Sequence, residues 1–505
     1  MKQGMNRRGF LRNVALSGAG LVVLRNARSV WGAPASQKLN VALVGVGGRG
    51  TWFVDEMPRM ENIVAFCDVN DQKIAEAFKR WENRATAWPG SKNDWERNAA
   101  PIYQRLVEKR VKTFHDFRKM LDEMGKEIDA VMVATPDHTH AVASAAAIKA
   151  GKPVFAEKPL TRLVFESRAL RELARKHKVV TAMGNQGTYS GAFRRALELI
   201  RDGTLGEIKE VHVWNSGGGS DRKEPPKGEE PVPEHLKWDL WLGPAKARPF
   251  HKEWLQRHSW REFGTCQLGN WASHSANLGF MALKVHELWL TETPKEPRPV
   301  IRIEAKTSGI NRLSFPKWEL IKWGIPARAE FPPITFTWYN GAAPGIRELL
   351  EPLMKAGMER QEALLKAAPE NERPKIRAAA EREREGWRFA GTLVVGTKGT
   401  IHTTGHNMWF WLLPQEQFKG VPTDRPEQVE QSRGPEQDWF AAIRGGKAPW
   451  SNFDYADALN EFLMLGNVAT QFESPLDFEP IAMKITNNAE ADAALRCEYR
   501  EGWTL

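Results

Sequence analysis

Short apolar runs alternate with amphipathic stretches over residues 39–183. The amphipathic stretches at 141–150 and 165–177 have helical periodicity. Strands that are apolar on both faces and separated by helices are typical of a parallel sheet covered on both sides. We therefore predict an α/β unit with mostly β-branched strands at 39–44, 63–67, 130–134, 153–156 and 179–183.

The pattern changes after Gly184. Longer runs there alternate polar with apolar residues, which is typical of antiparallel strands with one covered face. We predict such strands at 208–214, 300–306, 334–339, 393–403 and 408–413, with a glycine-containing turn at 396–399. The chain thus divides into an N-terminal domain, 36–184, and a C-terminal α+β domain, 185–505, with a large, mostly antiparallel sheet.

Two segments are interpreted as insertions. Residues 79–110 carry many Trp, Asn and Arg and interrupt the first pattern. Residues 345–387 are charged and helix-forming, but Pro352, Pro369 and Pro374 interrupt them. Because proline ends or kinks a helix, we expect a broken helical insert on the surface there.

The first 35 residues have the order of segments found in a secretory signal peptide. The arginine pair Arg7 and Arg8 follows a basic start, residues 14–24 are apolar, and small residues at 33–35 suit cleavage. The pair favours the twin-arginine (Tat) type, and hence export to the periplasm. The apolar run is too short to span a bilayer, which takes about 20 residues, and we expect no membrane span elsewhere. A cytoplasmic N-terminus without regular structure is the less favoured alternative.

Charge and cysteine content narrow the possible partners. The formal net charge is +10, but the first 35 residues hold six Lys or Arg and no acid, so the remainder carries +4. Acidic and basic residues are mixed along that remainder, and we expect no nucleic-acid partner. Three cysteines, Cys67, Cys266 and Cys497, cannot all pair and lack the spacing of a zinc site, so we expect buried thiols.

A glycine turn follows the first predicted strand. Gly45, Gly47 and Gly50 form a G-x-G-x-x-G pattern before a plausible helix at 51–57. Glycines permit the tight turn and let backbone amides contact a pyrophosphate at a helix N-terminus. The second strand is followed by Asp68, whose carboxylate can accept both ribose hydroxyls and repels a 2′-phosphate. The pattern predicts a Rossmann domain that binds NAD rather than NADP, and a glycine-rich turn without a ligand is the less favoured alternative.

The next strand end also carries polar residues. Thr135, Pro136 and His140 belong to a Thr-Pro-Asp-His-Thr-His segment that opens a helix. It lies at the carboxyl end of the predicted sheet, where α/β proteins bind ligands. A His-x-His pair without further ligands at recognisable spacing favours capping and cofactor contact, so we predict no metal site.

Another predicted strand ends in Glu157-Lys158-Pro159. Proline fixes the turn, and the lysine would project into the crevice that holds the nicotinamide. An ammonium there can hydrogen-bond a substrate hydroxyl and favour its alkoxide as hydride leaves. On this motif alone, a solvated lysine in a strand-end turn remains the alternative.

These motifs resemble, in order and spacing, the glucose–fructose oxidoreductase, inositol dehydrogenase and rhizopine-catabolism (Gfo/Idh/MocA) family. Four further stretches look like its exported, sugar-associated branch. They are Met-Gly-Asn-Gln at 183–186, Trp-Leu-Gly-Pro at 241–244, Ala-Glu-Ala at 489–491 and Tyr-Arg-Glu-Gly-Trp at 499–503. The resemblance covers nearly the whole chain after the predicted signal peptide.

The resemblance implies a Rossmann domain followed by an α+β domain whose open sheet supports a homo-oligomer, a dimer or a tetramer. It also implies that Lys158 and a histidine from the second domain, His274, handle the substrate proton. An imidazole with a pKa near 6.5 suits proton transfer near neutrality. The expected cofactor contacts are Gly45, Gly47, Arg49, Gly50, Asp68, Thr135, Pro136, His140, Glu157, Lys158, Asn185 and Gln186.

The stretch around His274 departs from the family's Gly-Asp-x-x-x-His-x-x-Asp pattern. Both aspartates are replaced, by Asn270 and Asn277. An asparagine can orient a sugar hydroxyl, but it cannot hold a negative charge beside an imidazolium. A non-catalytic NAD- or sugar-binding homologue therefore stays open as an alternative.

The chain contains 21 tryptophans. Indole faces pack against the C–H faces of sugar rings, and the indole N–H groups bond hydroxyls. Six lie on the expected substrate side, although any single one is expected to be core: Trp214, Trp238, Trp241, Trp254, Trp260 and Trp271. The predicted substrate contacts are Asn270, Trp241 and Arg248.

Together these features predict an NAD-dependent oxidoreductase acting on a sugar, polyol or keto-glycoside. Because NAD is not freely recycled outside the cytoplasm, an exported enzyme would keep its cofactor and regenerate it in place. Transient oxidation of a sugar carbon also acidifies the neighbouring C–H. A redox-assisted glycoside hydrolase using the same residues is therefore the second prediction.

Overall fold

The computed structural model describes residues 37–290 and 298–505. The predicted signal peptide, 1–35, lies outside these residues. Among the residues described, no helix is long and apolar enough to cross a membrane. Cys67 and Cys266 are buried free thiols, whereas Cys497 is exposed, so the expectation of three buried thiols is wrong for Cys497.

Six parallel strands form the N-terminal sheet, in the order β3-β2-β1-β4-β5-β6. This is the strand order of a Rossmann fold and confirms the predicted α/β class. The strands are β1 (Asn40–Val44), β2 (Asn62–Cys67), β3 (Lys112–Phe114), β4 (Ala130–Val133), β5 (Val154–Glu157) and β6 (Thr181–Gly184). The sequence pattern missed β3 because this edge strand is short and lacks an apolar run.

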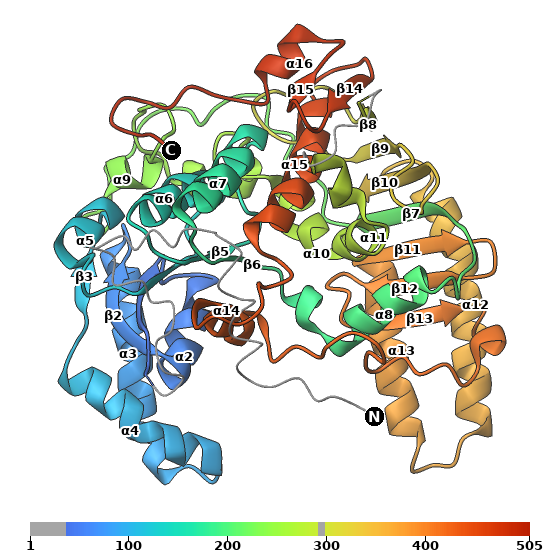
Figure 1. Cartoon of the computed structure of the whole chain (residues 1–505), viewed down its shortest axis with the longest axis horizontal. Helices are drawn as coiled ribbons and strands as arrows, with labels where there is room; N and C mark the ends of the chain where they lie inside the picture. Colours follow the sequence, from blue (N-terminus) through green and yellow to red (C-terminus); the bar gives the residue numbers. More distant parts are fainter. Residues whose placement is uncertain (1–36, 291–297) are drawn as a thin grey trace, which may run out of the picture.

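Helices cover both faces of this sheet (Figure 1). One face packs against α5 (Phe117–Met124), α6 (Asp137–Lys149) and α7 (Val164–His177). The other face packs against α2 (Gly50–Met60) and α3 (Asp71–Ala87), and α4 (Asp94–Glu108) packs on α3. The segment interpreted as an insertion is thus the second half of α3 and α4.

A nine-stranded sheet forms the second layer, in the order β13-β12-β11-β7-β10-β9-β8-β14-β15. Neighbouring strands are antiparallel except β7 and β10, so the sheet is mostly antiparallel, as predicted. The strands are β7 (Ile208–Asn215), β8 (Ile301–Thr307), β9 (Glu319–Ile325), β10 (Ile334–Asn340), β11 (Ala390–Gly396), β12 (Thr400–Thr404), β13 (Phe410–Leu413), β14 (Leu476–Glu479) and β15 (Lys484–Ile485).

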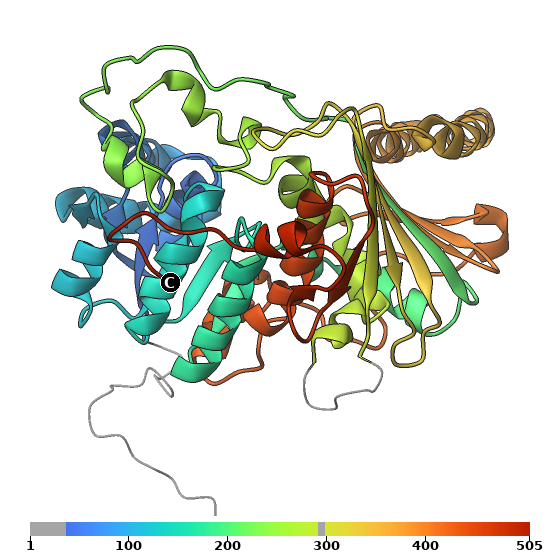
Figure 2. The same cartoon turned by 90° about the horizontal axis from the view of Figure 1, so that it is seen from above.

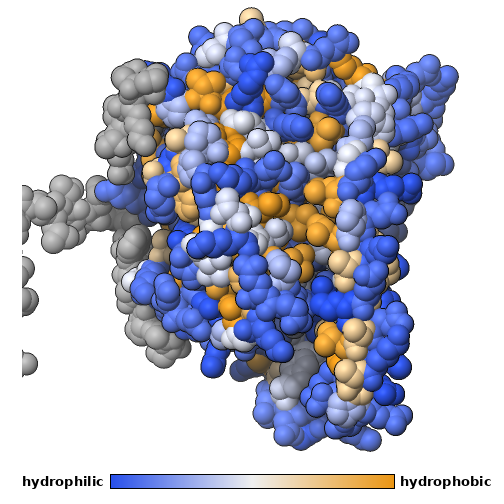
Figure 3. Space-filling view, turned by 90° about the vertical axis from the view of Figure 1, so that its right-hand side faces the viewer, coloured by the Kyte–Doolittle hydropathy of each residue, from blue (hydrophilic) through white to orange (hydrophobic). Residues whose placement is uncertain are grey.

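The two faces of the nine-stranded sheet differ in what covers them. The inner face packs against α8 (Gly191–Arg201), α11 (Asn277–Ala282) and α15 (Phe453–Ala469). In β9 the residues at every second position are buried in the inner core, and the residues between them, Leu320, Lys322 and Gly324, are more exposed on the outer face. Figure 3 views the molecule from the side of this sheet and shows mostly hydrophilic residues with smaller hydrophobic patches between them.

The predicted helical insert is a pair of helices, α12 (Ile346–Ala367) and α13 (Arg373–Arg388), between β10 and β11. It lies against the outer face of the sheet (Figure 2), where Leu350 and Trp387 pack with sheet residues such as Trp214. Pro352 lies within α12, and Pro374 occupies the first turn of α13, where its missing N–H costs nothing.

The C-terminal third of the chain returns to the Rossmann domain. Trp439 in α14 (Pro435–Ile443) is fully buried beneath the first sheet, with its ring 5.6 Å from that of Phe155. Helix α15 packs along α7, where Arg168 and Arg171 form buried ion pairs with acidic residues of α15. The two sheets are therefore joined by shared helices as well as by the chain connection. The described residues also include three short α-helices, α9 (Trp238–Leu242), α10 (Ser273–Ser275) and α16 (Ala489–Ala493).

Candidate functional site

The glycine turn connects β1 to α2 and leaves its backbone open to a pocket. Gly45 has φ +85°, and a Cβ on it would lie 2.5 Å from the carbonyl oxygen of Ala134. A Cβ on Gly50 would lie 2.1 Å from the carbonyl oxygen of Gly45. Helix α2 has no side-chain cap. The N–H groups of Gly50 and Thr51 donate to the carbonyl oxygens of Gly47 (2.8 Å) and Gly48 (3.2 Å), so the turn and the start of the helix form one compact unit that faces the pocket.

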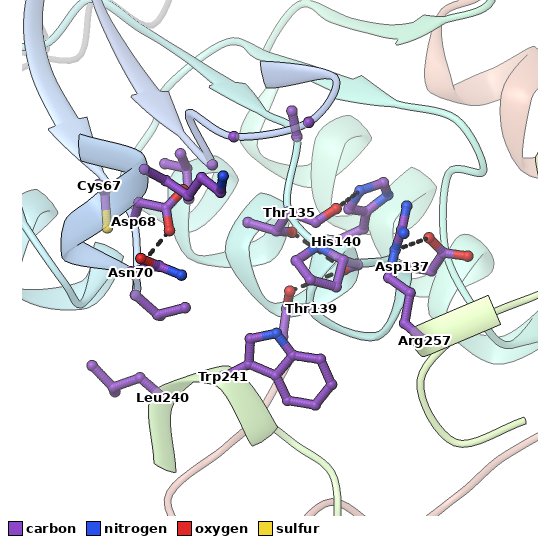
Figure 4. A pocket seen from close by; sticks show the side chains of 18 of the residues that line it. Cys67, Asp68, Asn70, Thr135, Asp137, Thr139, His140, Leu240, Trp241 and Arg257 are labelled. Atoms are coloured by element: carbon purple, nitrogen blue, oxygen red, sulfur yellow. Dashed lines mark hydrogen bonds and ion pairs between the residues drawn. The ribbon is translucent and has the colours of Figure 1, made fainter. Parts of the chain in front are cut away.

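Asp68 stands at the end of β2, on the rim of the same pocket (Figure 4). Its carboxylate accepts hydrogen bonds from the backbone N–H of Val46 (2.9 Å) and of Asn70 (3.0 Å). Burial raises the pKa of Asp68, and these backbone bonds oppose the rise. The carboxylate is held in place beside the glycine turn, in the position from which ribose hydroxyls are bound.

The pocket has a volume of about 450 Å³ and lies along the carboxyl ends of β1, β2, β4 and β5. This volume falls within the range of small-molecule sites, about 300–1,000 Å³. Residues of the second domain form its other wall, among them Trp241, Arg257 and Asn270. The glycine turn, the uncapped helix and Asp68 together fit a dinucleotide, whose adenosine ribose and pyrophosphate these residues would hold.

His140 joins two strand-end turns at the floor of the pocket. Its Nδ1 lies 2.7 Å from the carbonyl oxygen of Pro159, and its Nε2 lies 2.8 Å from that of Thr135. The predicted contacts Thr135 and Pro136 line the pocket beside it. The structure thus gives His140 a structural position as well as a place on the pocket wall.

Glu157, the residue before Lys158, is held in place by two hydrogen bonds to its carboxylate. Its carboxylate accepts from Nε of Arg49 (2.8 Å) and from Nε2 of Gln186 (3.3 Å). Arg49 and Glu157 line the pocket, whereas Gln186 reaches Glu157 from the first turn after β6. Glu157 therefore links two other predicted cofactor residues, Arg49 and Gln186.

Lys158 reaches across the pocket to the second domain. Its Nζ donates to the backbone oxygen of Asn270 (2.7 Å) and to the side-chain Oδ1 of Asn270 (2.6 Å). Burial lowers the pKa of Lys158 to about 8, and the charges of Glu157 and Asp137 oppose this shift. The amine is therefore poised to hold or lose a proton close to neutral pH.

His274 lies one helical turn beyond Asn270, at the end of a π-helical segment, Leu268–Ala272, that continues into α10. Its Nδ1 is 3.1 Å from Oδ1 of Asn185, whose Nδ2 donates to the carbonyl oxygen of Ser273 (2.5 Å). Because the amide is oriented by Ser273, its Oδ1 must accept, so Nδ1 of His274 carries the proton and Nε2 is the basic nitrogen.

The imidazole of His274 is neutral in this environment. Burial lowers its pKa well below the usual value, and the nearby charges of Lys158 and His406 lower it further. The ring of His406 lies 4.5 Å from that of His274. His406 was not predicted, because it stands outside any motif in the turn after β12. The expected pKa near 6.5 is thus wrong for His274, although the neutral ring can still accept a proton.

The two asparagines have different surroundings. Asn270 lines the pocket and binds Lys158, whereas Asn277 is fully buried away from it. The side chain of Asn277 donates to Thr188 (2.8 Å) and accepts from the hydroxyl of Tyr455 (2.5 Å). Of the two replacements, the one at 270 therefore changes the pocket.

Among the residues the structure describes, Trp241 is the one of the six named tryptophans that lines the pocket. Trp238, Trp254 and Trp260 pack with it in a small apolar core, Trp214 packs under α13, and Trp271 packs on Phe389. Arg248 does not reach the pocket: it pairs with Glu262 and lies over the ring of Trp254. Trp503, from the C-terminal segment, lines the pocket although its place could not be read from its motif.

Fold and site together define a Rossmann-type dinucleotide-binding protein with a lysine and a histidine beside the cofactor pocket. Residues 39–185 match the model of the oxidoreductase family with an NAD-binding Rossmann fold, GFO_IDH_MocA. The N-terminal domain of the chain is thus similar to the Rossmann domain of the Gfo/Idh/MocA family.

Three curated relatives illustrate the similarity. Inositol 2-dehydrogenase of Rhodococcus erythropolis is 30% identical over 178 residues, 35% of this chain and 44% of the relative. Levoglucosan dehydrogenase of Pseudarthrobacter phenanthrenivorans is 26% identical over 185 residues, 34% and 39% of the two chains. Glycosyl hydrolase family 109 protein 2 of a Shewanella species is 26% identical over 223 residues, 41% and 44%. The chain thus spans less than half the length of each of these relatives.

Solved structures share the fold over most of the chain. A levoglucosan dehydrogenase in complex with NADH and L-sorbose has a TM-score of 0.51 and 17% identity, covering 87% of this chain and 99% of that one. An aldose–aldose oxidoreductase from Caulobacter crescentus has a TM-score of 0.51 and 14% identity, with the same coverage. At these sequence identities the two comparisons show a shared fold and no more.

A methyl group at Gly50 should distort the glycine turn, residues 45–50, that would hold the nucleotide. The Cβ of Gly50→Ala would collide with the carbonyl oxygen of Gly45, so the turn must shift and NADH affinity should fall about tenfold or more, roughly 1.4 kcal/mol. NADH fluorescence titration measures this. Gly90→Ala, whose Cβ would meet open space, is the control. A folded Gly50→Ala protein that binds NADH as tightly as the wild type would contradict the assignment of this turn to the nucleotide.

A carboxylate at position 270 should hold the Lys158 proton to higher pH. In the wild type the pKa of this amine is about 8, so the charge is lost as pH rises through that value. Asn270→Asp places an opposite charge in contact, and the titration midpoint should rise by roughly one unit or more. NMR titration of ¹³C-lysine protein, with Lys158→Met to assign the signal, measures it. Asn270→Ser adds no charge, and a midpoint shared by the Asp and Ser variants would refute this electrostatic account.

Proposed function

We propose that the protein is an NAD-dependent oxidoreductase acting on a CH–OH group of a sugar, polyol or keto-glycoside. The observation that carries the proposal is the contact between Lys158, at the end of a Rossmann strand, and Asn270, one turn before His274. Lys158 and Asn270 both line the pocket of the glycine turn, and the buried His274 follows Asn270 without lining the pocket itself, which supports a reacting centre shared by the two domains.

When bound, NAD supplies the redox chemistry by taking a hydride from the substrate carbon or returning it. The ammonium of Lys158 would donate a hydrogen bond to the substrate oxygen and stabilise negative charge that develops there. The basic Nε2 of His274 would take the hydroxyl proton, with Asn185 holding the ring in that tautomer. Asn270 orients the amine through two oxygens and leaves its third N–H for the substrate.

A carbohydrate substrate is supported by the wall of the pocket and by the relatives. Trp241 offers an indole to the pocket, and Leu240 and Leu255 add apolar surface. The similar curated proteins include an inositol 2-dehydrogenase and a levoglucosan dehydrogenase. Both names denote enzymes of hydroxyl-rich ring compounds, which supports the same substrate class here.

Export with a retained cofactor completes the proposal. The twin-arginine pattern of residues 1–35 supports transport of a folded, loaded protein to the periplasm. A nucleotide that is not exchanged there must be reoxidised or rereduced in the same pocket. We expect native mass spectrometry of the protein purified from the periplasm to show one bound NAD(H) per chain. Recovery of nucleotide-free protein that turns over with added NAD would overturn the retained-cofactor proposal.

A redox-assisted glycoside hydrolase is the second candidate, because several curated relatives are named glycosyl hydrolase family 109 proteins. Oxidation beside the glycosidic carbon would acidify a C–H, and elimination followed by addition of water would break the glycosidic bond. Incubation with a nitrophenyl glycoside separates the candidates: released nitrophenol without net NADH favours the hydrolase, and net NADH favours the oxidoreductase.

Both candidates require Lys158 and His274. Once a substrate is found, Lys158→Met and His274→Gln should each lower kcat by about 100-fold or more, the usual contribution of proton-transfer groups, while NADH affinity stays within about twofold. Stopped-flow or steady-state kinetics beside NADH titration measure the two effects. Lys126→Met, on the surface of the same domain, is the control. Variants with intact turnover would favour a different reacting centre, and absence of turnover in the wild type would favour a non-catalytic binding protein.

A further inference from the structure

Arg257 is a cation of the pocket that neither the motifs nor the fold assign. It belongs to the loop of the second domain between Leu255 and Trp260, and its side chain lines the pocket opposite the Rossmann strand ends (Figure 4). Its side chain is 37% exposed, and its Nε is buried without a hydrogen bond. Among the described residues, no side chain or carbonyl accepts a hydrogen bond from this guanidinium.

Arg257 has one nearby counter-charge, Asp137, which it shares with other groups. Nε of Arg257 forms a long ion pair with Oδ1 of Asp137, at 3.5 Å and without a hydrogen bond, and His258 also lies 3.9 Å from this carboxylate. Asp137 accepts from the hydroxyl of Thr265 (2.7 Å) and is the first residue of α6, where the helix N-terminus stabilises a carboxylate. The guanidinium therefore keeps its planar set of donors, two terminal nitrogens included, for another acceptor.

The charges around Lys158 leave this end of the pocket positive. Lys158 is held by two neutral oxygens of Asn270, and Arg49 is matched by Glu157. Asp137 is then the remaining carboxylate near two positively charged side chains, Lys158 and Arg257. The two cations lie close enough that the charge of Arg257 contributes to the lowered pKa of Lys158, after the larger effect of burial. An anion would relieve this repulsion.

We propose that the substrate is an anionic sugar, a uronate or an aldonate, whose carboxylate binds Arg257 while its reacting hydroxyl lies at Lys158. A guanidinium matches a carboxylate with two parallel N–H···O bonds, a geometry that an ammonium does not offer. The neutral Asn270 leaves the positive charge of the pocket for the substrate to balance. This inference rests on the proposed function and adds its substrate class.

The cofactor pyrophosphate is the competing partner for Arg257. The backbone of the glycine turn and the N-terminus of α2 already offer a site for phosphates. Arg257 instead projects from the substrate domain beside Asp137 and Lys158, at the other end of the pocket wall. A carboxylate of the substrate is thus the better match, and a separate NADH titration of the wild type and the Arg257 variants tests the pyrophosphate alternative.

Calorimetric titration of the NADH-loaded protein tests the inference. The probes are sodium D-glucuronate, sodium D-galacturonate and sodium D-gluconate, with methyl D-glucuronate, D-glucose and D-galactose as neutral counterparts. We expect at least one acid to bind about tenfold more tightly than its neutral counterpart. Arg257→Gln should abolish that preference, and Arg257→Lys should retain part of it, because a point charge remains without the bidentate geometry. The uronates and gluconate distinguish a carboxylate at opposite ends of the sugar.

Arg302→Gln is the matched control for net charge, since Arg302 is an exposed residue of β8 that pairs with Asp477. It should leave the preference for acids unchanged. Equal binding of acids and neutral sugars by the wild type, or a preference that survives in Arg257→Gln, would overturn the inference. An Arg257→Gln protein that instead loses NADH affinity would assign the residue to the cofactor and also overturn it. Failure of the wild type to bind NADH at all would remove the proposed function itself, so the two failures are distinguishable.

Discussion

The hydrogen bonds from Lys158 to Asn270 are the contact on which the site depends. They join the end of a Rossmann strand to a helical segment of the second domain, more than a hundred residues further along the chain. Glu157 and Arg49 line the pocket before this bridge in the chain, and the buried pair Asn185 and His274 lies outside the pocket lining. This contact joins the two walls of the pocket, while the packing of α14 and α15 on the Rossmann domain joins the domains themselves.

Exclusion of water gives those polar groups their properties. Burial is the largest cause of the lowered pKa of both Lys158 and His274, and each of the two positively charged forms would disfavour the other. A neutral amide between them adds no counter-charge. Burial thus favours the neutral form of the imidazole, whereas an incoming negative charge would be favoured by the positive charges of Lys158 and Arg257.

Local signals in the sequence predicted the Rossmann half well, because its glycine turn, Asp68 and Lys158 each follow a strand that its own residues specify. The other half was less predictable. The outward positions of β9 alternate with buried ones, but the strand lies outside any motif. His406 and Arg257 reach the site through loops, and the use of most of the named tryptophans as core follows from contacts between distant segments. Such contacts leave no periodic trace in the chain.

Trp439 carries a consequence for how the molecule is made. This indole fills the core beneath Phe155, yet it is synthesised more than two hundred residues after the last strand of the first sheet. A ribosome that has finished the nucleotide-binding strands has not yet released the side chain that seals their underside. The hydrophobic core of the nucleotide-binding domain is therefore complete only after Trp439, Phe440 and Ile443 have been synthesised.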